Sequence, residues 1–129
     1  MSLPIRVLGF AGSLRQGSYN RAALRAAGQP MPAGGVLETF DLAPIPLYNG
    51  DVEAQGFPPA VQEFKAAIRA ADALLIVTPE YNYSLPGVLK NAIDWASRPP
   101  QDSPLSGKPI AIMGASMGGL CMCERVAVL

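Results

Sequence analysis

Four short apolar runs are spaced along the chain, and each leads into glycine, proline or other turn-forming residues. Short runs that are apolar throughout are typical of strands buried on both faces of a parallel sheet, because no position needs to face water. The predicted strands are Ile5–Ala11, Gly35–Leu42, Ala73–Thr78 and Lys108–Ala115.

Helical periodicity fills the intervals between these runs. In the stretch Pro58–Asp72 the apolar residues Val61, Phe64 and Ile68 recur at a spacing that places them on one helical face. Two further helices are predicted at Asn20–Gly28, where Gly28 is a plausible stop, and at Pro86–Ser97. Strands that alternate with helices indicate an α/β domain with a parallel sheet and right-handed crossovers.

The connection from Ala43 to Pro58 is long and contains several prolines and glycines. One interpretation is a stiffened surface loop. The other is a site wall or a subunit contact, because long ordered loops are uncommon in compact domains unless they have a role. The sequence leaves both open.

The composition narrows the class of protein. A chain of 129 residues that is 50% apolar and 16% charged predicts one folded domain over residues 1–129. Ten basic and ten acidic residues cancel, which speaks against binding to nucleic acid or to a membrane surface. No apolar run is long enough to span a bilayer, and no signal-peptide pattern opens the chain.

The reactive side chains are few. There is no histidine, which excludes Ser-His-Asp and Cys-His triads and the usual metal sites. Cys121 and Cys123 form no disulfide framework, so we expect a reducing cytoplasm, and without a third ligand they make a poor zinc site. We therefore predict no metal and no catalytic side chain, and expect the chemistry to come from a cofactor.

Ligands of open parallel sheets bind beyond the carboxyl ends of the strands. The loop after the first predicted strand is rich in donors and precedes a helix N-terminus, which favours an anion. No lysine follows Gly17 as in a P-loop, and there is no G-x-G-x-x-G, so a monophosphate is favoured over a dinucleotide. Alternatively, Ser18 or Asn20 is only an N-cap and Arg15 is solvated. The candidate residues are Ser13, Leu14, Arg15, Gln16, Gly17, Ser18, Tyr19 and Asn20.

The loops after the third and fourth predicted strands complete this edge. Pro79, Glu80, Tyr81 and Asn82 offer apolar and aromatic faces beside hydrogen-bonding groups, as a flat heteroaromatic ligand requires. The alternative is an ordinary turn that happens to contain tyrosine. In the glycine-rich loop that follows the fourth strand, Ser116 is a possible donor.

Four motifs, "GSLRQGSYN", "PLYNGDVE", "TPEYNYSLPGVLKNAIDW" and "GASMGG", give the chain a close resemblance to the NADPH-dependent FMN reductases, a flavodoxin-like group that includes quinone, chromate and azo-dye reductases. The resemblance implies a doubly wound parallel sheet of order 2-1-3-4-5 and the cofactor FMN. It implies NADPH or NADH as co-substrate, a quinone or similar small molecule as electron acceptor, and a homodimer or homotetramer. The FMN phosphate would lie on Ser13, Arg15, Ser18 and Asn20, and the flavin along Pro79–Asn82 and near Ser116.

The chain departs from this pattern after "GASMGG". Members of the family continue through a helix, a fifth strand and a last helix, whereas this chain reads "LCMCERVAVL". We therefore expect a domain that is incomplete at its C-terminus, with the order 2-1-3-4 and with Gly118–Leu129 as a terminal helix or loose segment. Two alternatives to the reductase stay open. One is an FMN-binding electron carrier, which the zero net charge disfavours, and the other is a non-catalytic truncated flavodoxin-like module.

Overall fold

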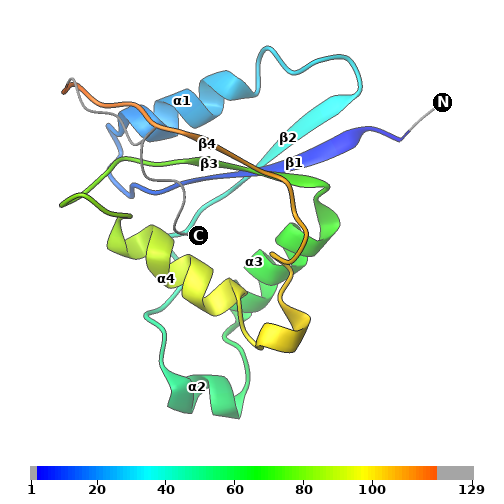
Figure 1. The fold of residues 1–129 in the computed structure, drawn as a ribbon, viewed down its shortest axis with the longest axis vertical. Helices are drawn as coiled ribbons and strands as arrows, with labels where there is room; N and C mark the ends of the chain where they lie inside the picture. Colours follow the sequence, from blue (N-terminus) through cyan, green and yellow to red (C-terminus); the bar gives the residue numbers. More distant parts are fainter. Residues whose placement is uncertain (1–2, 119–129) are drawn as a thin grey trace.

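A computed structural model describes residues 3–118 as four strands and a set of helices arranged around them (Figure 1). The predicted strands and helices are confirmed, with boundaries that shift by one or two residues. In chain order the elements are β1 (Ile5–Ala11), α1 (Tyr19–Ala27), β2 (Gly35–Phe40), α2 (Gly50–Gln55), α3 (Pro59–Ala70), β3 (Ala73–Val77), α4 (Gly87–Ala96), the 3-10 helix η1 (Pro100–Asp102) and β4 (Ile110–Met113).

The strands form one parallel sheet in the order β2-β1-β3-β4, as predicted. The carboxyl ends of all four strands therefore lie at the same edge of the sheet. Near this edge Phe10 of β1 is in register with Phe40 of β2 on one side and with Ile76 of β3 on the other. Of the predicted terminal segment Gly118–Leu129, residues 119–129 lie outside the described residues, Cys121 and Cys123 among them.

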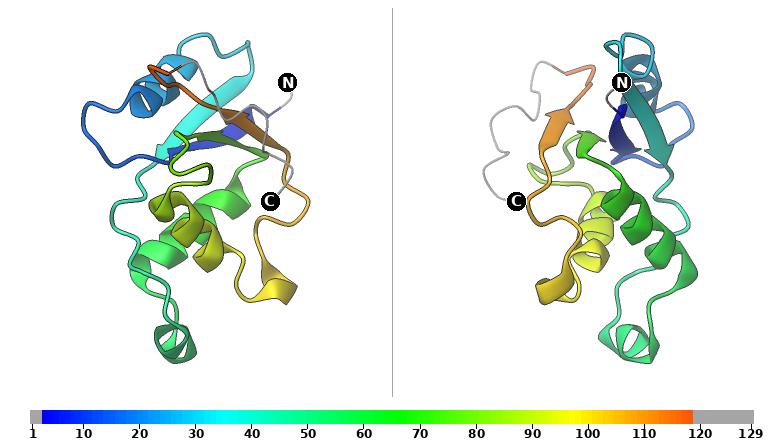
Figure 2. Two further views of the ribbon diagram at one scale, coloured as in Figure 1. Left: turned by 60° about the vertical axis from the view of Figure 1, so that its left-hand side comes forward. Right: turned by 90° about the vertical axis from the view of Figure 1, so that its right-hand side faces the viewer.

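Helices cover the two faces of the sheet unequally (Figure 2). The α1 helix packs on one face through Leu24, which joins a small cluster with Ala11 and Val77. The helices α3 and α4 lie on the other face, and the larger core lies between them and the sheet. Among residues 3–118, no helix is long and apolar enough to cross a membrane.

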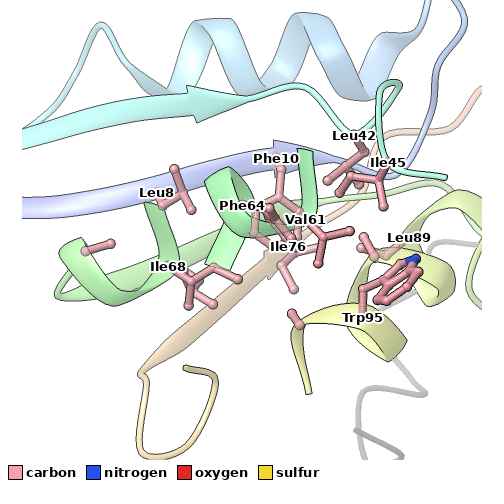
Figure 3. Packing of buried hydrophobic residues seen from close by; sticks show 14 residues of the cluster. Leu8, Phe10, Leu42, Ile45, Val61, Phe64, Ile68, Ile76, Leu89 and Trp95 are labelled. Carbon is pink, nitrogen blue, oxygen red and sulfur yellow. The ribbon is translucent and has the colours of Figure 1, made fainter. Parts of the chain in front are cut away.

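Alternate residues of the strands meet the helical faces in the larger core (Figure 3). The ring of Phe64 on α3 lies 5.2 Å from that of Phe10 and 5.0 Å from that of Phe40, measured between ring centroids. Trp95 on α4 is fully buried, and its indole N–H donates to the Pro46 carbonyl at 2.8 Å.

The connection Ala43–Pro58 is not a plain loop, because it contains α2. Asn49 caps this short helix by accepting a hydrogen bond from the Asp51 N–H at 2.9 Å. The Tyr48 hydroxyl donates to Glu53 at 2.6 Å, and the Arg98 guanidinium lies 3.3 Å from the same carboxylate. The bond from Tyr48 lowers the pKa of Glu53 and in turn raises the pKa of the phenol. The segment is thus fixed to the end of α4 by side-chain contacts.

Candidate functional site

A cavity of about 300 Å³ lies at the carboxyl edge of the sheet, where the connections after β1, β3 and β4 meet. These connections are named the first, second and third loops, in that order. No residue of the connection Ala43–Pro58 is among those that line it within the described chain, so that connection does not form a wall of this cavity. The lining residues are Ser13, Arg15, Ser18, Tyr19, Asn20, Thr78, Pro79, Glu80, Tyr81, Gly114, Ala115, Ser116 and Met117.

The start of α1 supplies hydrogen-bond donors to this cavity. Ser18 is the N-cap, and its hydroxyl accepts from the Arg21 N–H at 3.3 Å. The N–H groups of Tyr19 and Asn20 have no hydrogen-bond partner within residues 3–118, as expected for the first positions of a helix. These N–H groups and the positive end of the helix dipole make the place favourable for an anion.

Arg15 adds a positive charge to the same end of the cavity. Its guanidinium donates to the Gly17 carbonyl at 2.9 Å, which uses one of its five N–H donors. It forms no ion pair with a carboxylate of the described chain. Ser13 is buried beside it, and its hydroxyl lies 3.4 Å from the Arg15 backbone N–H. Hydroxyl, guanidinium and backbone donors together suit a phosphate group.

Asn20 joins the first and third loops. Its side-chain amide donates to the Ala115 carbonyl at 3.0 Å, and its side-chain oxygen accepts from the Ala115 N–H at 3.0 Å. The residue is buried, and Ser18 rather than Asn20 caps the helix. The amide retains one further N–H, but its main contact in the structure is this pair of bonds. Asn20 therefore positions the third loop beside the start of α1.

The second loop folds into a tight turn. The backbone groups of Tyr81 and Ser84 exchange two hydrogen bonds, of 3.0 and 3.1 Å, and Asn82 and Tyr83 between them have φ of 52° and 61°. Positive φ at both central positions is the geometry of a type I′ turn, which asparagine tolerates and tyrosine rarely adopts. Such a backbone outlier beside a cavity indicates a constrained functional loop. The turn leaves Tyr81 about half exposed at the cavity.

The third loop closes the cavity on the α1 side. The Tyr19 hydroxyl donates to the Met117 sulfur at 3.0 Å, which bridges α1 and this loop. The Ser116 hydroxyl accepts from the Gly118 N–H at 3.0 Å and donates to no group among residues 3–118. Within the described part of the chain, no cluster of three or more His, Cys, Asp or Glu side chains could hold a metal ion.

Nine of the thirteen candidate residues line the cavity, and four do not. Leu14 and Gln16 are exposed and do not line it, although they alternate along the chain with the lining residues Ser13 and Arg15. Gly17 has no side chain to contribute. Asn82 occupies the exposed tip of the turn, where its main contribution is its tolerance of the left-handed conformation.

The prediction from sequence also missed lining residues, among them Thr78 and Met117. Thr78 is fully buried, and its hydroxyl donates to the Pro79 carbonyl at 2.9 Å. It was assigned to the apolar strand. A hydroxyl at the carboxyl end of an otherwise apolar run was the signal that could have identified it. Met117 carried no comparable signal, because its place depends on the contact with Tyr19.

Gly12, directly after β1, lies against Thr78, directly after β3. A Cβ atom at Gly12 would lie 2.1 Å from the Thr78 hydroxyl oxygen and 2.7 Å from its Cβ. The Gly12 N–H meanwhile donates to the Val77 carbonyl at 2.9 Å. Only glycine permits this approach without displacing Thr78.

Comparisons with known proteins agree with this geometry. The family model described as NADPH-dependent FMN reductase matches residues 5–126. The chain is 65% identical over 118 residues to an NAD(P)H-dependent FMN reductase of Pseudomonas aeruginosa, and 49% identical over 120 residues to the quinone reductase of Escherichia coli. Each alignment covers 92% of this chain but 63% of the relative, so the chain spans less than two thirds of their length.

A solved structure shows the same fold. The flavoenzyme NAD(P)H:(acceptor) oxidoreductase FerB from Paracoccus denitrificans superposes with a TM-score of 0.76 at 38% identity. The match covers 89% of this chain and 63% of FerB. The four-stranded sheet is therefore flavodoxin-like, as the sequence motifs implied.

We predict that Gly12→Ala lowers the free energy of unfolding by about 1–3 kcal/mol, the usual range for overpacking. Gly17→Ala is the matched control, because a Cβ at Gly17 meets nothing within 4 Å. Urea unfolding of the full chain measures both variants. Equal stabilities of the two variants would contradict the close approach of Gly12 and Thr78.

Proposed function

The chain belongs to the family of NADPH-dependent FMN reductases, and on this basis we propose that it is an NAD(P)H-dependent oxidoreductase that binds FMN and reduces a quinone or a similar small acceptor. The observation that carries the proposal is the convergence of three loops on one cavity. The first loop offers donors for a phosphate, the second loop the exposed ring of Tyr81, and the third loop the hydroxyl of Ser116. The proposal favours an enzyme over an electron carrier or a non-catalytic module, because the matched relatives bear the names of reductases.

The donor set suits the phosphate of FMN. In this proposal the backbone N–H groups of Tyr19 and Asn20 bind it together with the side chains of Ser13, Arg15 and Ser18. Backbone and hydroxyl donors need no change of protonation, and a guanidinium group does not titrate in the physiological range of pH. The binding of the phosphate should therefore vary little between pH 6 and pH 9 through these residues.

The second and third loops would position the flavin ring. The side chains of Pro79 and Tyr81 line the cavity and present apolar surface, and Ser116 can donate a hydrogen bond to a ring edge. When bound, FMN accepts a hydride from a reduced nicotinamide and passes electrons to an acceptor. The role of these residues is to bind and orient the flavin and to leave its ring accessible from the open side of the cavity.

The assembly and the compartment are also proposals. We propose a homodimer or homotetramer, because apolar side chains are exposed at β4, where Ile110 and Met113 are 43% and 42% accessible. Strand edges with exposed apolar residues associate readily. A cytoplasmic location suits an enzyme that consumes NAD(P)H, and it agrees with a sequence that shows no disulfide framework.

A first prediction concerns the phosphate site. Arg15→Ala should weaken FMN binding by about 1–3 kcal/mol, the scale of a charge-assisted hydrogen bond. Riboflavin, which lacks the phosphate, should bind the variant and the parent equally. Flavin fluorescence titration measures both ligands, and Arg69→Ala, which removes a charge on α3, is the control. Unchanged FMN affinity in folded Arg15→Ala protein would rule out this role.

A second prediction concerns turnover. The purified full chain should bind FMN, oxidise NADPH or NADH, and do so faster when a quinone is added. Absorbance of the reduced nicotinamide follows the reaction. FMN binding without oxidation of either nicotinamide would instead support a carrier. No FMN binding by folded protein would support a non-catalytic module.

A third prediction concerns association. Light scattering after size exclusion should give a mass above that of one chain, and Ile110→Lys should reduce it by placing a charge at the edge strand. Val36→Lys is the matched control, because Val36 lies on the opposite edge strand β2 and is also 43% exposed. A monomeric parent chain would refute the proposed oligomer. Equal effects of the two lysines would refute the role of β4.

A further inference from the structure

A second cavity, of about 210 Å³, lies on the other side of the first loop. It is bounded by α1 and by the residues at the end of β2 and just after it. Ser13 lines both cavities, so the two adjoin at this residue. The polar and charged side chains of the second cavity are those of Ser13, Arg21, Arg25, Thr39 and Asp41.

The described arginines fall into two groups. Arg6, Arg69 and Arg98 each form an ion pair, with Glu38, Asp102 and Glu53 respectively. By contrast, Arg15, Arg21 and Arg25 have no carboxylate partner among residues 3–118. All three of these belong to the first loop or to α1, and each lines one of the two cavities. The arginines of the described chain that lack a carboxylate partner are thus gathered at the two cavities.

The geometry of α1 brings two of these charges to the second cavity. Arg21 and Arg25 are four residues apart on one helix, so their side chains lie on the same face. Arg21 donates to the Leu14 carbonyl at 3.3 Å, which leaves most of its donors unused. The Arg25 side chain makes no hydrogen bond to another of residues 3–118, although its backbone carbonyl accepts one from the Gly28 N–H. Two guanidinium groups on one face are suited to an anion with several oxygen atoms.

Asp41 does not neutralise this cavity. Its carboxylate accepts a hydrogen bond from the Ala43 N–H at 3.0 Å and forms no ion pair with either arginine. With two guanidinium groups and one carboxylate, the cavity keeps a net positive charge. The hydroxyls of Ser13 and Thr39 add donors that need no charge.

We propose that this second cavity is a subsite for a phosphate group of the nicotinamide dinucleotide, with Arg21 and Arg25 as its binding residues. The proposal rests on the proposed function, because it assumes that a nicotinamide dinucleotide binds beside FMN. FMN carries one phosphate, for which the first cavity has donors. A dinucleotide carries at least two more phosphates and must reach the same edge of the sheet. The adjoining cavity holds the unpaired charge that such a group requires.

The test is calorimetric titration of the FMN-loaded full chain with NADP⁺ and with NAD⁺. Arg25→Gln should weaken the binding of the dinucleotide about tenfold, the scale of one charge-assisted hydrogen bond, and leave FMN affinity unchanged. Arg25→Lys, which keeps the charge, should restore part of the loss. Arg69→Gln is the matched control, because it removes an arginine from α3 on the other face of the sheet.

The outcomes show which phosphate of the dinucleotide the subsite binds. A loss for both dinucleotides supports a site for the pyrophosphate, and a loss for NADP⁺ alone supports a site for the 2′-phosphate. Equal affinities of Arg25→Gln and Arg69→Gln protein for both dinucleotides would overturn the proposal. The titration is repeated on flavin-free protein. If FMN does not bind but Arg25→Gln still weakens the dinucleotide, the proposed function fails and the subsite stands.

Discussion

The parallel pairing of β1 with β3 is the constraint on which the site depends. These two strands are central, and the chain leaves β1 toward β2 on one side and β3 toward β4 on the other. The first and second loops therefore diverge from adjacent strand ends, where a ligand can enter between them. The pairing is tight at this edge, because Gly12 has no side chain to hold Thr78 away. A wider spacing here would separate the phosphate donors from the aromatic turn.

Much of the fold could be predicted because the signals are local. Continuous apolar runs identify buried parallel strands, and the spacing of Val61, Phe64 and Ile68 identifies the buried face of α3. The α2 helix could not be predicted in this way. It has six residues, none of them buried, and its stability comes from its cap and from the contact of Glu53 with Arg98, which is 45 residues away. Local periodicity does not record such a contact.

In the site, too, local sequence predicts some features, and contacts between distant residues determine the others. The rule that ligands bind at the carboxyl ends of parallel strands is general, so the loops that form the cavity could be predicted from the order of the elements. Which side chains do which task depended on the tertiary structure. Asn20 looks like a donor to a ligand in the sequence, yet it is paired with Ala115, 95 residues further along. The contact of Tyr19, at the start of α1, with Met117 could not be predicted either, because 98 residues separate the two.

The zero net charge of the chain conceals a polarised surface. A formal sum treats every charge alike, but the ion pairs of Arg6, Arg69 and Arg98 leave little field at a distance. Of the arginines without a carboxylate partner among residues 3–118, Arg15 and Arg21 lie around the start of α1, where the helix dipole has the same sign, and Arg25 lies in its last turn. Because the charges of Arg15 and Arg21 add to that of the helix N-terminus, this end of the molecule favours an anion although the formal net charge of the whole chain is zero. The distribution of ion pairs is therefore more informative about ligands than the net charge.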